Sequence, residues 1–196
     1  MGQNSSTKVA LTEQERQLLF KNWGQSELQG YENCGQKIFR KIFQLNPHVK
    51  LVFNLPMDSD DPADYPKPFF KHMRVFMNML ELAVTKSDHL DELKNLCVEL
   101  GKRHAKLDQS RGFKPEHWHI FERAIIECAT EWHEASPDRA DEAEKRKIVA
   151  AWSKLVSYMI FHMKSGFYGE SDALDESAPA NVKHSSSGTV DSHLNS

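Results

Sequence analysis

The sequence predicts an all-α protein, and three observations support that prediction. Apolar residues recur three or four positions apart through the middle of the chain, as they do on one face of a helix. The segments between these runs are short and rich in Pro, Gly and Asp. No stretch alternates apolar and polar residues as a half-buried strand would. The chain has 196 residues, which suits one domain with tails, and a core of about 150 residues can fold without disulfides.

Two helices are expected at the start of the chain. The first is expected over residues 11–26, where Thr12 and Glu15 have the spacing of a capping box. The second is expected over residues 27–46. It should end there because the residue before Pro47 is sterically disfavoured in the helical region.

The remaining elements follow from the same patterns. A short apolar piece at 49–55 precedes a loop, "PMDSDDPADYPKP", which contains four prolines and four aspartates. Four more helical segments are expected after it, over residues 69–83, 89–108, 113–133 and 136–167, and the third of these carries Pro115 in its first turn.

The two ends of the chain are polar. Residues 171–196 are Ser-rich and short of aromatic residues, which predicts a disordered tail after a folded domain over residues 12–170. Residues 1–11 are expected to be flexible. They begin Met-Gly-Gln-Asn-Ser-Ser, which fits the pattern for myristoylation of Gly2. A single myristoyl chain gives only marginal membrane binding, so any membrane contact through Gly2 should be reversible.

Composition narrows the class of protein. The formal net charge is −3, and this balance does not favour nucleic-acid binding, which usually requires a basic face. No run of 18 apolar residues predicts a transmembrane helix, and no hydrophobic signal region is present. Cys34, Cys97 and Cys128 form no C-x-x-C pair and are interpreted as small buried hydrophobic residues. Together these features indicate a reducing, cytoplasmic environment.

Two histidines lie on apolar helix faces. In "FFKHMRVFMNMLELA", His72 shares a face with Phe69, Met73 and Phe76. His104 lies in helical register with Cys97, Leu100 and Leu107. A single core histidine that hydrogen-bonds a carbonyl is ordinary, but two separate helices here each bury one imidazole. Burial favours the neutral imidazole, which is the form that binds a metal.

The chemistry of two opposed imidazoles points to one kind of site. A structural zinc site needs four ligands, and no thiolate or carboxylate accompanies this pair in the sequence. Two imidazoles do suit an iron whose other four ligands come from a macrocycle, with phenylalanines covering its flat faces. No H-E-x-x-H, nucleophile elbow or Gly-rich phosphate loop offers a competing site.

Across residues 12–168 the chain resembles the globin family, most of all the nematode globins. The resemblance rests on Trp23 late in the first helix, on Phe53 six residues after Pro47, and on His72 followed 32 residues later by a histidine in "LGKRHAKL". The segments "GFKPEHWHIFERAI" and "AAWSKLVSYMIFHM" resemble the last two globin helices. The resemblance implies a globin fold, with six to eight helices packed at about 50° around a haem pocket.

The resemblance also implies roles for particular residues. His104 would be the proximal ligand of the iron in haem b (iron protoporphyrin IX), and His72 would lie on the distal side. Phe53 would pack against the haem, and Phe39 and Phe76 would line the distal pocket. Many nematode globins have tyrosine where this chain has Phe39, and phenylalanine cannot donate a hydrogen bond to oxygen.

Several functions fit these residues. With both histidines on the iron, the protein would act in electron transfer or in redox or gas sensing, with an unknown electron donor or acceptor and a possible contact with a membrane. With an open sixth position it would be an oxygen carrier or store, in which His72 donates a hydrogen bond to the gas. A haem enzyme acting on nitric oxide, nitrite or peroxide also fits, as does a helical binding module without a cofactor. The gas ligands in question are oxygen, nitric oxide and carbon monoxide.

Overall fold

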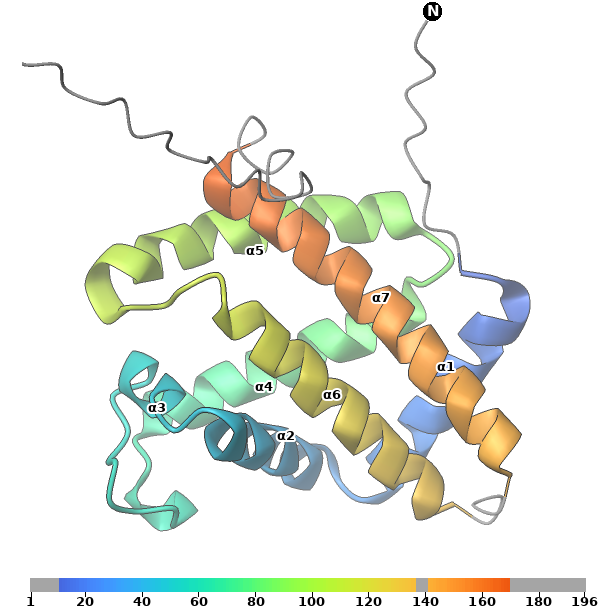
Figure 1. Cartoon of the computed structure of the whole chain (residues 1–196), viewed down its shortest axis with the longest axis horizontal. Coiled ribbons are helices and arrows are strands. Elements are labelled where there is room, and N and C mark those ends of the chain that lie inside the picture. Colours follow the sequence, from blue (N-terminus) through green and yellow to red (C-terminus); the bar gives the residue numbers. More distant parts are fainter. Residues whose placement is uncertain (1–10, 137–140, 170–196) are drawn as a thin grey trace, which may run out of the picture.

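The computed structural model describes residues 11–136 and 141–169, and within these ranges all regular structure is helical (Figure 1). The predicted all-α class is therefore confirmed. Gly2 and the segment 171–196 lie outside the described residues. The elements are α1 (Glu13–Leu28), α2 (Tyr31–Leu45), α3 (Val49–Val52), the short 3₁₀ helix η1 (Pro62–Asp64), α4 (Lys67–Thr85), α5 (Leu90–Arg111), α6 (His117–Glu134) and α7 (Glu142–Tyr168).

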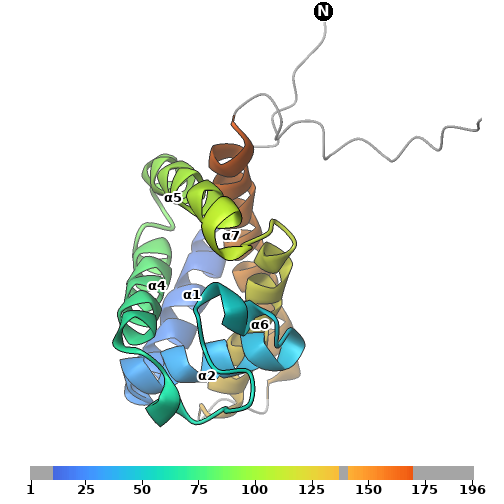
Figure 2. The same ribbon diagram turned by 90° about the vertical axis from the view of Figure 1, so that its left-hand side faces the viewer.

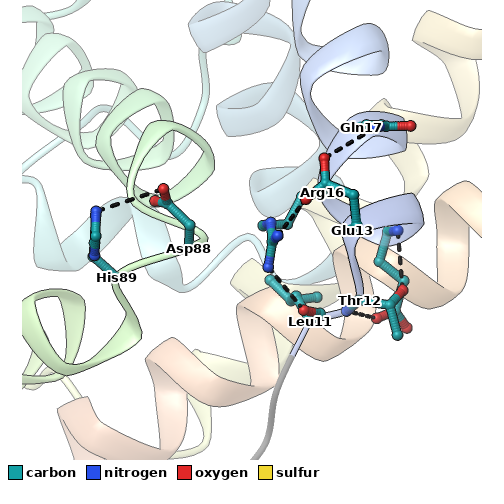
Figure 3. Close-up of polar contacts among 8 residues, drawn as sticks. Leu11, Thr12, Glu13, Arg16, Gln17, Asp88 and His89 are labelled. Carbon is teal, nitrogen blue, oxygen red and sulfur yellow. Dashed lines mark hydrogen bonds and ion pairs between the residues drawn. The ribbon is translucent and has the colours of Figure 1, made fainter.

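The start of α1 has the capping box that the sequence predicts. The Thr12 hydroxyl accepts a hydrogen bond from the Glu15 backbone N–H at 3.2 Å, and the Thr12 backbone N–H donates to Glu15 Oε2 at 2.6 Å. Arg16 adds a hydrogen bond to the Leu11 carbonyl and an ion pair with Glu13 (Figure 3). These contacts satisfy backbone groups that the first turn of a helix otherwise leaves unpaired.

Three predicted helix boundaries were wrong by a turn or more. α1 runs on to Leu28, and Gly30, with φ at 89°, separates it from α2, because this backbone conformation interrupts a helix and is readily adopted by glycine. α6 begins at His117 rather than at residue 113. α7 begins at Glu142 rather than near residue 136. The Asp141 side chain caps this start by accepting hydrogen bonds from two backbone N–H groups.

A cluster of tryptophans holds α1, α6 and α7 together. The rings of Trp23, Trp132 and Trp152 are buried, with centroids 5.9–6.3 Å apart. Asn22 lies beside them and is 2% exposed. It donates to the Ala129 carbonyl at 3.0 Å and accepts from Trp152 Nε1 at 2.8 Å, so this buried amide has partners on two other helices.

The helices that carry the two candidate histidines pack against different partners. α5 makes its most extensive contact with α7, whereas α4 packs on α2 and α1. α4 and α5 themselves have few close backbone approaches to each other. Figure 2 shows them one above the other on the same side of the molecule, with α6 and α7 on the other side. His72 on α4 and His104 on α5 are therefore held by different parts of the helical framework.

The three cysteines are buried and free, as interpreted from the sequence. Burial raises the pKa of the Cys97 and Cys128 thiols to about 12, so both remain protonated at neutral pH. These side chains behave as small apolar residues of the core.

Candidate functional site

His72 lies on α4 among aromatic rings. Its imidazole centroid is 5.1 Å from the Phe53 ring and 6.2 Å from the Phe39 ring. The side chain is partly buried, and within the described residues its ring nitrogens make no hydrogen bond to the protein. A buried polar group normally has a hydrogen-bond partner, so a partly buried imidazole without one has its nitrogens available to a ligand.

Phe39 is the centre of this aromatic cluster. It is 1% exposed and contacts five other phenylalanines at centroid distances between 5.2 and 6.1 Å, namely Phe43, Phe53, Phe69, Phe76 and Phe121. Phe39, Phe53 and Phe76 were predicted from the sequence as site residues, and the structure places all three together with His72. Phe121 on α6 had no predicted role, although this residue also contacts Phe76 at 5.9 Å.

His104 lies on α5 in a different setting. Its Nδ1 lies 2.8 Å from the carbonyl oxygen of Leu100, one turn earlier. A carbonyl can only accept, so Nδ1 carries the proton and Nε2 is the free, unprotonated nitrogen. The ring also packs against Trp118 and Phe113, at centroid distances of 5.0 and 5.2 Å. Histidines that bind metals commonly have such a hydrogen bond to a carbonyl, which fixes the tautomer and the ring orientation.

The electrostatics of the site favour two neutral imidazoles. Burial, together with the repulsion of a positive charge by the nearby His104 and Arg111, lowers the pKa of His72 to about 4. Burial also lowers the pKa of His104, against the opposing effect of its hydrogen bond to Leu100. The repulsion between His72 and His104 means that protonation of one disfavours protonation of the other. Both are therefore neutral and able to bind a metal at pH 7.

Three further histidines of the described residues have other surroundings. His89 and His119 are exposed, and each lies 3.5 Å from a carboxylate. His133 differs from these two, because it is buried. His133 is 2% exposed, and its Nε2 has no hydrogen-bond partner. It lies on the buried face of α6, where the surrounding glutamates in the sequence gave no sign of burial.

The donor set fits an iron held mainly by a macrocycle. Among the described residues, no group of three or more His, Cys, Asp or Glu side chains could hold a metal ion. Two neutral imidazoles with aromatic rings beside each would suit a haem, which needs imidazole ligands for its iron and flat apolar surfaces for its macrocycle. An all-α fold with one such histidine on each of two helices is consistent with a haem protein of the globin type.

The comparison with protein families gives the same answer. The globin family model matches residues 36–163, and the chain belongs to the globin family. Globins bind haem and, through it, diatomic gases. The expectation drawn from Trp23, Phe53 and the two histidines is therefore confirmed at the level of family and fold.

Individual relatives span a range of globin types. The chain is 31% identical over 166 residues to globin-related protein glb-13 of Caenorhabditis elegans, an alignment that covers 85% of this chain and 56% of the relative. The chain thus spans little more than half the length of that relative. It is 29% identical over 157 residues to an anaerobic nitrite reductase of Gossypium hirsutum, covering 79% of this chain and 91% of that protein.

A solved structure shares the fold. The crystal structure of a hexacoordinated haem protein from an anhydrobiotic tardigrade, at pH 4, matches with a TM-score of 0.65 and 19% identity. The match covers 84% of this chain and 99% of that chain. At this identity the match supports the fold alone.

The described helices include none long and apolar enough to span a membrane.

Proposed function

We propose that this globin binds haem b with two protein ligands on the iron, His104 on the proximal side and His72 on the distal side. The observation that carries the proposal is the state of His72, a partly buried imidazole with a pKa of about 4 and no hydrogen bond to the described protein. An imidazole kept neutral in this way, with a second neutral imidazole on a neighbouring helix in the sequence, is suited to be a ligand. The tardigrade structure that shares the fold is itself of a hexacoordinated haem protein.

The roles of the aromatic residues follow from this arrangement. Phe53, Phe39 and Phe76 would exclude water from the distal side and hold the His72 ring by edge and tilted ring contacts. None of these phenylalanines can donate a hydrogen bond, so within this cluster only His72 could donate one to a bound gas. Haem held in this way supplies a one-electron couple of the iron.

The function that suits two axial histidines is electron transfer or redox and gas sensing. Neither ligand has to be recruited from solvent when the iron changes oxidation state, so little reorganisation accompanies the electron. A gas would bind only after His72 has left the iron. The electron donor or acceptor is a second protein or small reductant, and myristoylation of Gly2 would bring the reaction to the cytoplasmic face of a membrane.

The visible spectrum of the purified protein tests the coordination. In the dithionite-reduced, oxygen-free protein we expect sharp, well-split visible bands, which are the signature of six-coordinate iron. His72→Ala should convert them into one broad band while haem remains bound. A single broad band in the unmodified protein would reject His72 as a ligand and favour the oxygen carrier, in which His72 donates a hydrogen bond to the gas.

A second candidate function has its own support. Two plant relatives, at 29% and 28% identity, are named anaerobic nitrite reductases. We propose nitrite reduction as the alternative activity: ferrous haem would supply one electron to nitrite, and a proton from solvent, relayed through the N–H of the neutral His72, would release nitric oxide and hydroxide. Anaerobic nitric oxide release from nitrite by the reduced protein tests it, and loss of that activity in His72→Ala, despite a more open iron, would support the role of His72.

The membrane contact has a separate test. If Gly2 is myristoylated, Gly2→Ala should move the protein from the membrane fraction of cells to the soluble fraction. An unchanged distribution would remove the membrane from the proposal and leave the haem chemistry as it stands.

A further inference from the structure

Two glycines lie where α5 crosses α7, close to His104. A Cβ added at Gly101 would lie 1.9 Å from the carbonyl oxygen of Met163 and 2.9 Å from the backbone nitrogen of Phe167. A Cβ added at Gly166 would lie 2.0 Å from the carbonyl oxygen of Val98. Each glycine thus admits the backbone of the opposite helix. At both positions the obstacle is main chain, which cannot turn aside as a side chain can.

The contact between α5 and α7 is connected to the candidate proximal ligand, His104, through the backbone of α5. Gly101 is one turn before His104, and its nitrogen shares a peptide group with the carbonyl of Leu100. That carbonyl is the acceptor for His104 Nδ1 at 2.8 Å. Because the peptide group is planar and rigid, holding Gly101 against α7 also fixes the direction of the Leu100 carbonyl. The orientation of the imidazole follows from that direction.

We propose that the reciprocal contact of Gly101 and Gly166 is a backbone clamp that positions His104 as the proximal iron ligand. The proposal deepens the proposed function and rests on haem being bound through His104. Both glycines are positioning residues, since neither contacts the site itself. Their helical backbone would accept alanine, so the requirement for glycine comes from the approach of the two helices alone.

The test compares alanine substitutions in the full-length haem-loaded protein. Gly101→Ala and Gly166→Ala should each displace α5 from α7 by about 1 Å or more, because van der Waals contact requires that separation. We expect haem to transfer to an excess of an acceptor apoprotein roughly 10–100-fold faster, as when the outer partner of a metal ligand is lost. The reduced visible bands should also broaden.

Two other helical glycines provide matched controls. Gly24→Ala meets nothing within 4 Å. Gly35→Ala, on the distal side of the fold, meets the flexible side chains of Met73 and Met77 at 2.9–3.2 Å. Both controls should keep the haem-transfer rate within about twofold of the original, since neither moves backbone near His104. Equal rates in all four variants would overturn the clamp.

A second background separates positioning from a general packing defect. In His104→Gly, free imidazole can occupy the proximal position without a bond to α5. Gly101→Ala should then change neither the haem-transfer rate nor the spectrum of the imidazole-loaded protein, because the two changes are coupled only through His104. If Gly101→Ala has its full effect in that background, it acts on the fold and the proposal is wrong.

If neither clamp variant folds, hydrogen exchange of the unsubstituted haem protein tests the backbone clamp instead. The clamp predicts that amides of residues 101–104 exchange as slowly as the slowest amides of α7, through global unfolding. Faster exchange by local opening would contradict it. These outcomes are distinct from failure of the proposed function, in which the unsubstituted protein would bind no haem or would lose haem at the same rate in His104→Ala.

Discussion

The two sides of the candidate haem site are built differently. On the α5 side, His104 donates a hydrogen bond to a backbone carbonyl, and its helix lies in direct main-chain contact with α7. On the α4 side, His72 has ring contacts with Phe39 and Phe53 and no hydrogen bond to another residue in the described part of the chain. The closest approach at Gly35 between α2 and α4 is through methionine side chains, which are flexible. One histidine is held by backbone and the other by side chains.

This difference indicates which ligand can leave the iron. A side chain fixed by a hydrogen bond and by a helix that cannot shift keeps its position when the iron changes state. An imidazole among phenylalanines can move by small rotamer changes of its neighbours, at a cost much lower than separating two helix backbones. We therefore expect His104 to be the permanent ligand and His72 the exchangeable one.

The largest expected effect is the loss of the permanent ligand. His104→Ala should increase the rate of haem loss by more than roughly 100-fold, beyond the range observed when only the partner of a ligand is removed. His72→Ala should keep its haem, because the proximal bond remains. Haem transfer to an acceptor apoprotein measures both. Equal retention by the two variants would show that the sides do not differ in this way.

The stability of the haem-free protein should decrease as the pH is lowered. The folded-state pKa of His72 is about 4, below the ordinary value of 6.5, so the unfolded state binds more protons between these values. Folding should therefore weaken as pH falls from 7 to 5, by about 2 kcal/mol from His72, and the lowered pKa of His104 acts in the same direction.

Urea unfolding of the apoprotein at the two pH values measures this loss. His72→Phe should remove most of the His72 contribution, and His89→Phe, at an exposed position, serves as the control. A loss of stability that is unchanged in His72→Phe would show that the imidazole is not as buried as the fold implies.

A hydroxyl added at position 39 should slow the dissociation of oxygen from the distal side of the site. Phe39→Tyr places a hydrogen-bond donor in the cluster beside His72, and one such bond contributes about 1 kcal/mol. We expect oxygen dissociation from the reduced protein to slow by about fivefold, measured by displacement with carbon monoxide. Phe43→Tyr is the control, since the aromatic contacts of Phe43 are with other rings and not with His72. An unchanged rate of oxygen dissociation in Phe39→Tyr would mean that the side chain at position 39 does not reach the bound oxygen.

The smallest expected effect sets the baseline for the glycine variants. Gly24→Ala adds a methyl group to α1 in open space, and alanine is favoured over glycine in a helix by roughly 0.5–1 kcal/mol. The free energy of unfolding should rise by that amount with no change in the visible spectrum. A decrease in stability would indicate that added methyl groups destabilise this fold for reasons other than contact with a neighbouring backbone.

Much of the fold and part of the site could be predicted from the sequence. The helical spacing of apolar residues predicted α4 and α5 and placed His72 and His104 on their apolar faces, because apolar periodicity indicates which face of a helix is buried. The boundaries at Gly30 and Asp141 were missed, since a left-handed glycine and a capping aspartate are local choices that several positions could have made.

The contacts between distant segments could not be predicted. Phe121 joins Phe39 and Phe76 only because α6 crosses α2, and Trp118 meets His104 only through the path of the loop before α6. Gly101 is part of the segment "LGKRHAKL", but nothing in that segment indicates that the backbone of α7 lies in contact with this glycine. Such features depend on tertiary packing, for which one sequence carries no periodic signal.

The kinetics of carbon monoxide binding to the reduced protein test the central claim most directly. If His104 is permanent and His72 exchangeable, the observed rate should level off at high carbon monoxide, at the rate at which His72 leaves the iron. In His72→Ala the rate should rise linearly with concentration. A linear dependence in the unsubstituted protein would mean that the sixth position is open and would contradict the exchange of His72 on the iron.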